Sequence, residues 1–267
     1  MATKLPSVDA VLIGFGWTGA IMAQELTEAG LKVLAIERGD WRDTPTDFSP
    51  AYAQDELRYY WRHELFQRLN HDTLTIRNKT SETALPMRQL GSFLLGSGVG
   101  GAGVHWNGQV WRFLPSDLKA RSHNLQRYGK AYVPDDMTIQ DYPVSYDDLE
   151  PFYDKFEYLC GVSGKAGNLK GVIQPGGDPF EGPRQREYPN PPLDMPYAPT
   201  LFGKAAAGLG HHPFPHPAAN ASRAYTNPLG VQLGPCTYCV FCEKYACGNY
   251  AKASAQTTIL PVLMRKQ

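Results

Sequence analysis

Four cysteines lie close together near the end of the chain, in the spacing C-x2-C-x2-C-x4-C: Cys236, Cys239, Cys242 and Cys247. Thiolates bind zinc, hold iron-sulfur clusters or form disulfides. A structural zinc site normally pairs two C-x2-C knuckles across a longer loop, which is missing here. Disulfides over so few residues would restrict the unfolded chain only slightly. The C-x2-C-x2-C run is typical of ferredoxin-type ligation. The spacing therefore favours an iron-sulfur cluster, with zinc and with free or disulfide-bonded thiols as alternatives.

A glycine-rich turn near the N-terminus has the pattern G-x-G-x-x-G. The first glycine is expected to make the tight turn, the second to let the backbone approach a pyrophosphate, and the third to let a helix pack closely on a strand. Free N–H groups and the positive dipole end of the following helix favour phosphate there. An acidic residue at the end of the next strand is placed to bind a ribose. The pattern predicts a dinucleotide site formed by Gly14, Phe15, Gly16, Thr18, Gly19 and Glu37.

A strand, a helix and a second strand must position this turn. The apolar run 10–13 predicts the first strand, and the helical spacing of apolar residues over 21–29 predicts a helix that ends at Gly30. The apolar run 33–36 predicts the second strand. The fold class is therefore α/β, with a Rossmann-like dinucleotide-binding domain. A position so near the N-terminus fits FAD proteins, although the spacing alone also permits NAD.

Residues 91–112 contain seven more glycines beside an unusual group of aromatic and polar residues. Such a density of glycine suits a backbone that lies close to a flat or charged group, or a series of strained turns. The alternative is a glycine-rich loop that packs on the core. The residues expected to contact a cofactor here are Gly98, Gly101, Gly103, His105 and Asn107.

The order of these motifs resembles the glucose-methanol-choline (GMC) oxidoreductase family, whose members are FAD-dependent alcohol and sugar dehydrogenases and oxidases. The resemblance rests on GFGWTGA, GSGVGGAGVHWNGQVWRF and YPVSYDDLEPFYDKFE, and it covers almost the whole chain. It implies that the second glycine segment runs under the flavin. The His-Trp pair departs from the usual G-G-S-S-x-x-N and is similar to the T-H-W of pyranose oxidase. That similarity favours His105 as a covalent flavin ligand, with a hydrogen-bonding wall residue and a packed histidine as alternatives.

The tail CGNYAKASAQTTILP resembles a subset of the family, the bacterial membrane-bound dehydrogenase complexes, in which a cysteine motif holds a 3Fe-4S cluster. Related glucose dehydrogenases imply Cys236, Cys242 and Cys247 as the three ligands. The local spacing would instead choose Cys236, Cys239 and Cys242. Both sets stay open.

The resemblance also implies a function. The whole enzyme would oxidise a sugar or sugar acid, with gluconate to 2-ketogluconate favoured, by hydride transfer to FAD. Electrons would pass through the iron-sulfur cluster to a multihaem cytochrome c subunit and ubiquinone. A small subunit with a twin-arginine signal would export the chain to the periplasmic face of the inner membrane. The alternatives are a soluble FAD-dependent oxidase with structural cysteines and a non-catalytic electron-transfer subunit.

In this family the catalytic histidine, with its histidine or asparagine partner, lies near the C-terminus of longer chains. The general base is therefore expected beyond Gln267, and no catalytic residue is assigned here. The expected organisation is an FAD-binding domain over 1–120, a helix, Pro-rich linker and cysteine region over 121–255, and a return toward the FAD-binding domain over 256–267. In the second region, helical spacing with a capping pair, Ser145 and Asp148, predicts a helix that buries Cys160.

Composition limits the partners. Lysine plus arginine and aspartate plus glutamate both number 26, so no net charge attracts nucleic acid. No run reaches the roughly 18–20 apolar residues of a membrane span, and the first residues do not resemble a signal peptide. We therefore expect association with the membrane only through partner subunits.

Overall fold

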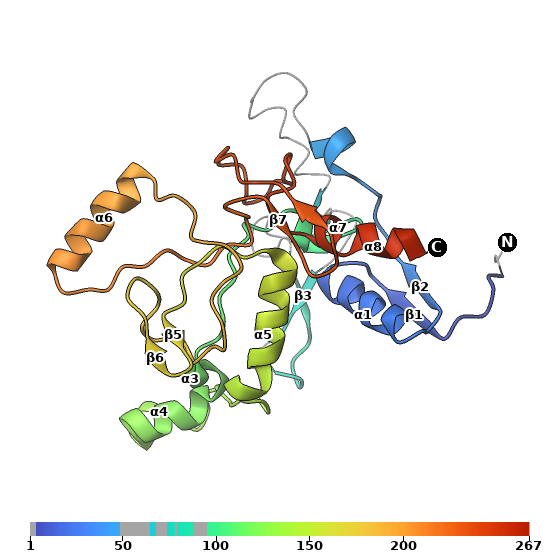
Figure 1. Ribbon diagram of the computed structural model, residues 1–267. Helices are drawn as coiled ribbons and strands as arrows, with labels where there is room; N and C mark the ends of the chain where they lie inside the picture. The colour runs from blue at the N-terminus through green and yellow to red at the C-terminus, as the bar shows by residue number, and fades with distance from the viewer. Residues whose placement is uncertain (1–3, 49–64, 68–73, 78, 88–94, 267) are drawn as a thin grey trace. The chain divides into compact units, whose positions relative to one another are not determined.

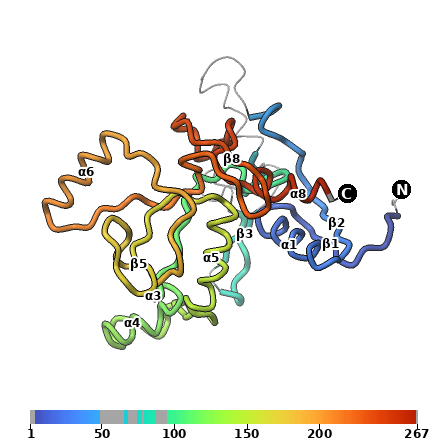
Figure 2. Tube along the Cα trace, viewed as in Figure 1, coloured from blue at the N-terminus to red at the C-terminus, as the bar shows by residue number. Residues whose placement is uncertain are grey.

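The computed structural model describes residues 4–48, 65–67, 74–77, 79–87 and 95–266 (Figure 1). The chain forms two compact units. The first unit comprises residues 1–108 and 229–267, and the second comprises residues 109–228. The chain can be followed in Figure 2, where its blue and red ends both belong to the first unit. The functional division predicted at residues 120 and 255 stays a prediction.

The first unit begins with the predicted strand, helix and strand. Strand β1 (Ala10–Ile13) and strand β2 (Val33–Ile36) are parallel, with Ala10 opposite Val33 and Ile13 opposite Ile36. Helix α1 (Trp17–Glu28) connects them, and Gly30 follows it with a left-handed φ of +84°. A parallel pair needs such a crossover connection, and its helix packs on the strands. These observations confirm the predicted unit.

The β1–β2 pair has an apolar side that the described residues leave uncovered. The side chain of Ile13 is 91% exposed, and those of Val11 and Ile36 are 52% and 50% exposed. Short strands with such exposed aliphatic residues contribute little burial energy by themselves.

The rest of the first unit consists of short elements. A π-helical turn η1 spans Thr44–Phe48, strands β3 (Leu74–Ile76) and β4 (Leu85–Met87) pair antiparallel, and a 3-10 turn η3 spans Gly101–Val104. Strand β8 spans Gln232–Leu233. Helices α7 (Ala255–Thr258) and α8 (Leu260–Leu263) and the 3-10 turn η5 (Met264–Lys266) follow. Helix α7 begins at Ser254, whose side chain accepts a hydrogen bond from the Thr257 N–H.

The second unit is built around one long helix, α5 (Tyr146–Cys160). Its start has the predicted capping box, because the Ser145 hydroxyl accepts from the Asp148 N–H at 3.2 Å and the Asp148 carboxylate accepts from the Ser145 N–H at 2.8 Å. The helix ends at Gly161, which has a φ of +62°. Cys160 is fully buried, as predicted.

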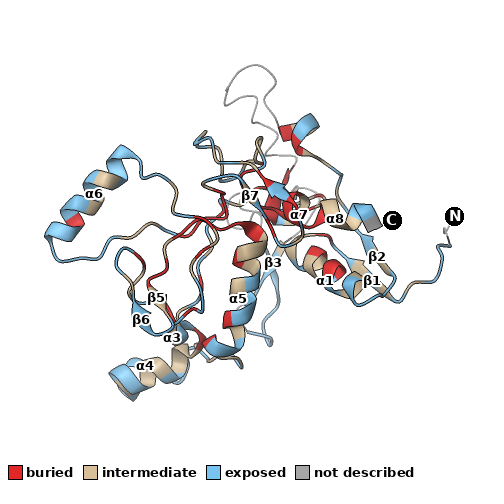
Figure 3. Ribbon diagram, in the orientation of Figure 1, coloured by how far each residue is buried: buried red, intermediate tan, exposed pale blue. Residues whose placement is uncertain are grey.

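Shorter elements surround α5. They are α3 (Pro115–Leu118), α4 (Ala120–Tyr128), η4 (Lys130–Tyr132), β5 (Asn168–Leu169), β6 (Val172–Ile173), α6 (Tyr197–Gly208) and β7 (Tyr225–Thr226). Figure 3 shows buried residues along α1, α5 and α7, whereas α4 and α6 are mostly exposed or intermediate. None of the helices among the described residues has the length and apolar character needed to cross a bilayer.

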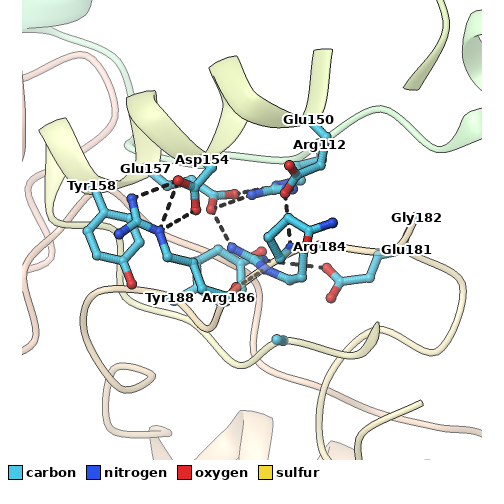
Figure 4. A network of polar contacts seen from close by, with 12 residues as sticks. Arg112, Glu150, Asp154, Glu157, Tyr158, Glu181, Gly182, Arg184, Arg186 and Tyr188 are labelled. Carbon is cyan, nitrogen blue, oxygen red and sulfur yellow. Dashed lines mark hydrogen bonds and ion pairs between the residues drawn. The ribbon is translucent and has the colours of Figure 1, made fainter. Parts of the chain in front are cut away.

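The centre of the second unit is an ionic network around Glu157 (Figure 4). Arg112 donates to both Glu157 carboxylate oxygens, at 2.7 and 2.9 Å, and Arg184 donates to one of them. Arg184 lies over the Tyr188 ring, 3.6 Å from its centre. Burial by itself would lower the pKa of Arg112, but hydrogen bonding and the charge of Glu157 raise this pKa above its usual range. The network links α5 to the segments that carry both arginines.

Candidate functional site

The glycine turn between β1 and α1 has the geometry that the motif requires. Gly14 has a φ of +93°, which residues with a side chain rarely adopt, and its N–H donates to the Ile36 carbonyl at 2.7 Å. A Cβ atom at Gly19 would lie 2.1 Å from the Gly14 carbonyl oxygen. Gly14 therefore makes the tight turn, and Gly19 allows α1 to pack directly on it.

The second glycine segment packs against this turn. The Gly100 N–H donates to the Phe15 carbonyl at 2.7 Å, and a Cβ atom at Gly101 would lie 2.9 Å from the Gly16 Cα. The sequence assigned Gly16 to a close approach by pyrophosphate, and the structure shows a close approach by Gly101. The pyrophosphate contact stays a prediction. The two motifs, far apart in sequence, form one glycine-rich surface.

Glu37 ties the end of β2 to the same turn. Its carboxylate accepts from the Phe15 N–H at 2.8 Å and from the Gly39 N–H at 3.0 Å. A carboxylate offers about four acceptor positions, so these two bonds leave capacity for a ribose hydroxyl. Sequence reasoning did not foresee that Glu37 would bind the glycine turn, because the contact depends on how β2 is paired with β1.

A cavity of about 650 Å³ opens beside Phe15 and Glu37. It is lined mainly by α1, β2, the turn between them and α8, including Leu34 and Leu260, and Met264 of η5 also contributes. Cavities of roughly 300–1,000 Å³ are typical of small-molecule sites. At the start of α1, Gly16 provides no side-chain cap, and Thr18 is exposed, so the first-turn N–H groups can receive an anion. The chemistry of this region fits a dinucleotide.

His105 follows directly after the second glycine segment. Its side chain is 5% exposed, its Nε2 has no hydrogen-bond partner within the described part of the chain, and its ring meets the Phe66 ring edge-on at 4.4 Å. Burial lowers the pKa of His105 to about 4. The imidazole is therefore neutral at physiological pH and keeps a nitrogen available for bonding.

The remaining predicted residues of this segment have different surroundings. A Cβ atom at Gly103 would lie 2.4 Å from the Trp17 indole nitrogen, so this glycine allows the segment to pack on α1. A Cβ atom at Gly98 would lie 2.8 Å from the Asp40 carbonyl oxygen. Asn107 is exposed. Contacts of Gly98, Gly103 and Asn107 with a cofactor stay predictions.

The cysteine loop, residues 235–250, does not bring its thiols together as a metal site. None of the four cysteines forms a disulfide in the described part of the chain, and all four are half-buried. No three His, Cys, Asp or Glu side chains in the described ranges lie close enough to hold a metal ion. Cys247 hydrogen-bonds to the Asn249 side chain at 2.8 Å, so a local partner satisfies its thiol. The predicted iron-sulfur cluster is not supported by this arrangement.

The backbone of the cysteine loop is unusually tight. Four residues with side chains have positive φ angles between +55° and +68°: Tyr238, Val240, Lys244 and Tyr250. Backbone N–H groups point at two sulfurs, from Tyr238 to Cys236 at 3.5 Å and from Lys252 to Cys247 at 3.4 Å. By itself the Tyr238 N–H bond would lower the pKa of Cys236, but burial outweighs it and raises this pKa.

Lys252 is a residue of the site that sequence reasoning missed. It is 1% exposed, and its Nζ donates to the backbone carbonyls of Trp106, Cys242 and Tyr245. Burial lowers the pKa of Lys252 to about 8. The only signal in the sequence is a lysine within a run of small residues, AKASA.

No family model matches the chain. It is 49% identical to the gluconate 2-dehydrogenase flavoprotein of Pantoea cypripedii over 100% of this chain and 44% of that protein. It is 30% identical to the fructose dehydrogenase large subunit of Gluconobacter japonicus over 84% of this chain and 39% of that protein. It is 28% identical to the 2-methyl-1,2-propanediol dehydrogenase of Mycolicibacterium austroafricanum over 84% of this chain and 35% of that protein. The chain thus spans less than half the length of these relatives. The matches confirm the resemblance drawn from the motifs.

Proposed function

We propose that this chain, as a member of the glucose-methanol-choline oxidoreductase family, is the FAD-binding part of a dehydrogenase that oxidises a sugar acid. The identity to a gluconate 2-dehydrogenase flavoprotein along the whole chain supports this proposal. The observation that carries it is the contact between Gly16 and Gly101, because it joins the nucleotide-binding turn to the segment of His105. A flavin cofactor needs both a site for its diphosphate and a second surface for its ring system.

In this proposal the pyrophosphate lies at the start of α1, where the first-turn N–H groups are free of a side-chain cap. Glu37 binds the ribose with the acceptor capacity left by its two backbone bonds. Bound FAD would supply the acceptor for the hydride of the substrate. The proposed cofactor residues are Gly14, Phe15, Gly16, Thr18, Gly19, Glu37, Gly98, Gly101, Gly103, His105 and Asn107.

We propose His105 as the covalent attachment point of the flavin. This proposal is supported by the buried, neutral imidazole of His105, whose Nε2 makes no hydrogen bond to the described residues. Acid precipitation of the complete protein should leave yellow flavin in the pellet. The variant His105→Ala should release it, and the control His211→Ala, at an exposed histidine, should retain it. Wild-type protein that releases all of its flavin into the supernatant contradicts the covalent link.

The favoured substrate is gluconate, oxidised to 2-ketogluconate. Gluconate, fructose and sorbitol should be supplied in turn to the complete protein with a dye acceptor, while flavin absorbance is followed. Gluconate should bleach the flavin and reduce the dye. If none of the three does either, the chain is a non-catalytic subunit. If oxygen is consumed in place of the dye, the protein is an oxidase.

The proposal of an iron-sulfur cluster is supported only by the spacing of the four cysteines. A 3Fe-4S cluster would require at least three of the four thiols to approach one another. Iron and acid-labile sulfide should be measured in the complete protein and in single Cys→Ser variants of Cys236, Cys239, Cys242 and Cys247. Loss of iron in three variants and retention in the fourth would identify the ligands. Protein without iron or sulfide would leave the thiols with a structural role.

The name of the fructose dehydrogenase large subunit supports an assembly of several subunits. We propose a multihaem cytochrome c subunit and a small subunit with a twin-arginine signal as partners, with ubiquinone as the final acceptor at the periplasmic face of the membrane. Co-purification of the tagged flavoprotein from its native membranes should recover both. Recovery of the flavoprotein alone would contradict the assembly. In functional terms, residues 1–120 would bind FAD, 121–255 would carry the linker and cysteines, and 256–267 would return to the FAD-binding domain.

A further inference from the structure

Lys252 is a buried cation with no acidic partner among the residues that the structure describes. Its side chain is 1% exposed, and none of the described carboxylates forms an ion pair with it. A lysine is rarely buried in this way unless its ammonium group is fully bonded. Here its three N–H donors meet three backbone carbonyls, those of Trp106 at 2.5 Å, Cys242 at 2.7 Å and Tyr245 at 2.7 Å.

The three carbonyls belong to two segments that lie far apart in the sequence. Trp106 follows His105 in the second glycine segment, and Cys242 and Tyr245 belong to the cysteine loop. Two more hydrogen bonds hold the second glycine segment to this part of the chain. One runs from the Lys244 N–H in the cysteine loop to the His105 carbonyl, and the other runs from the Trp106 indole to the carbonyl of Ala253, the neighbour of Lys252, both at 2.8 Å. Lys252 therefore stands where the two segments meet.

The second glycine segment is in turn fixed to α1. The Trp106 ring packs edge-on against Trp17, with ring centres 5.8 Å apart, and Gly103 allows the backbone to approach the same tryptophan. The cysteine loop contains no helix or strand, since residues 235–250 form turns, bends and irregular backbone. It is held by its bonds to the second glycine segment, by a bond from the Thr44 hydroxyl to the Cys247 carbonyl at 3.5 Å, and by the packing of Ala246 in a buried cluster with Phe48, Leu65 and Val104.

We infer that Lys252 is a positioning residue whose ammonium group holds the cysteine loop against the His105 segment. An ammonium group suits this task because its three donors can point at three converging carbonyls, whereas the donors of an arginine lie in one plane. The mechanical role stands on the structure alone. Its consequence for the flavin rests on the proposed function: the thiols and His105 would be held at a fixed separation.

The test compares the complete protein with the variant Lys252→Met, whose unbranched side chain replaces the lysine stem but lacks the terminal ammonium group and its donors. The matched control is Lys244→Met, on the same loop, whose side chain is 46% exposed and whose backbone bond to His105 is unchanged. Alkylation of each cysteine by iodoacetamide is followed by mass spectrometry. Buried Cys160, in the second unit, reports whether the protein remains folded.

Lys252→Met should raise the alkylation rates of Cys242 and Cys247 by about tenfold or more, since bonds to a charged donor are lost. Lys244→Met should leave these rates within about twofold of the wild type. Wild-type rates at Cys242 and Cys247 in Lys252→Met overturn the inference. If Lys252→Met also exposes Cys160, the protein has unfolded, and the variant Lys252→Arg, which keeps the charge, is used in its place. Faster alkylation of Cys242 and Cys247 in Lys252→Arg, with Cys160 still protected, supports the inference. Unchanged alkylation of these two cysteines overturns it.

The flavin provides the second readout. Acid-precipitated Lys252→Met should hold less flavin than the control variant, because the His105 segment loses part of its support. A pellet as yellow as the control's would overturn the coupling to the flavin. A wild-type protein without flavin would instead refute the proposed function, and the alkylation comparison would still test the role of Lys252.

Discussion

The network around Glu157 allows a sharp test of how the second unit is held together. In the variant Glu157→Gln the side chain keeps its shape, but it loses its negative charge and replaces one acceptor oxygen with an NH2 donor. Glu157 is 1% exposed and receives bonds from Arg112 at 2.7 and 2.9 Å as well as a bond from Arg184. The substitution therefore leaves two buried guanidinium groups with less compensation and places an amide donor against them.

The expected cost follows from this geometry. Removing one partner of a buried ion pair typically costs about 3–5 kcal/mol, because the remaining charge stays desolvated. No reduction for solvent screening is needed, since the Arg112 and Arg184 side chains are only 3% and 0% exposed. A loss of this size lowers Tm by roughly 6–20 °C, at about 2–4 °C per kcal/mol for domains of this size range. Glu150 also contacts Arg112, at 3.1 Å, and would keep the effect near the lower end.

The matched control lies on the same helix. Asp154 pairs with Arg186, whose side chain is 50% exposed, so Asp154→Asn should cost only about 0–1 kcal/mol. Both variants should be compared with wild type by urea unfolding, monitored by circular dichroism, and by thermal scans at pH 7. Equal destabilisation by the two variants, or a loss below about 1 kcal/mol for Glu157→Gln, would refute the assignment of the network as the centre of the unit.

Three further predictions concern other parts of the chain. The pKa of His105 falls from 6.5 to about 4 on folding, so flavin-free protein should lose up to about 3 kcal/mol of stability as the pH falls from 6.5 to 4. Urea unfolding across this pH range should show the loss in the free energy of unfolding, and His105→Gln should remove the contribution of His105 to it. If His105→Gln has the same pH dependence of stability as the wild type, the prediction is wrong. Gly19→Ala should abolish flavin retention because its Cβ would clash with Gly14, whereas Gly208→Ala, with open space around its Cβ, should retain wild-type flavin content. Flavin content at the wild-type level in Gly19→Ala would contradict the role of Gly19 in letting α1 pack on Gly14. Cys160 should resist iodoacetamide until the protein unfolds, because burial raises the pKa of its thiol; rapid native labelling would disprove its burial.

The sequence predicted the elements that local patterns determine. The strand, helix and strand around the glycine turn follow from apolar periodicity, a G-x-G-x-x-G turn and a glycine at the helix end, all of which act within a few residues. The start of α5 follows from the spacing of Ser145 and Asp148, and its end places Cys160 on the buried side. In each case the physical cause lies inside the segment itself.

Contacts between distant segments were not predictable in the same way. The packing of Gly101 on Gly16 and the bonds of Lys252 to Trp106 depend on the path of the chain between them. The cysteine spacing is typical of a cluster, but the orientation of each thiol depends on backbone angles such as the φ of +63° at Val240. Spacing restricts which ligands can come together, and it does not make them converge.

The exposed aliphatic face of the β1–β2 pair affects how the chain behaves in solution at high concentration. Ile13, 91% exposed, projects from a strand whose described neighbours form a sheet of only two strands. A strand edge that lacks a partner can pair with a strand of another chain, and an exposed apolar face favours such association. The purified chain of residues 1–267 should therefore self-associate as its concentration rises, and the substitution Ile13→Lys should improve its solubility.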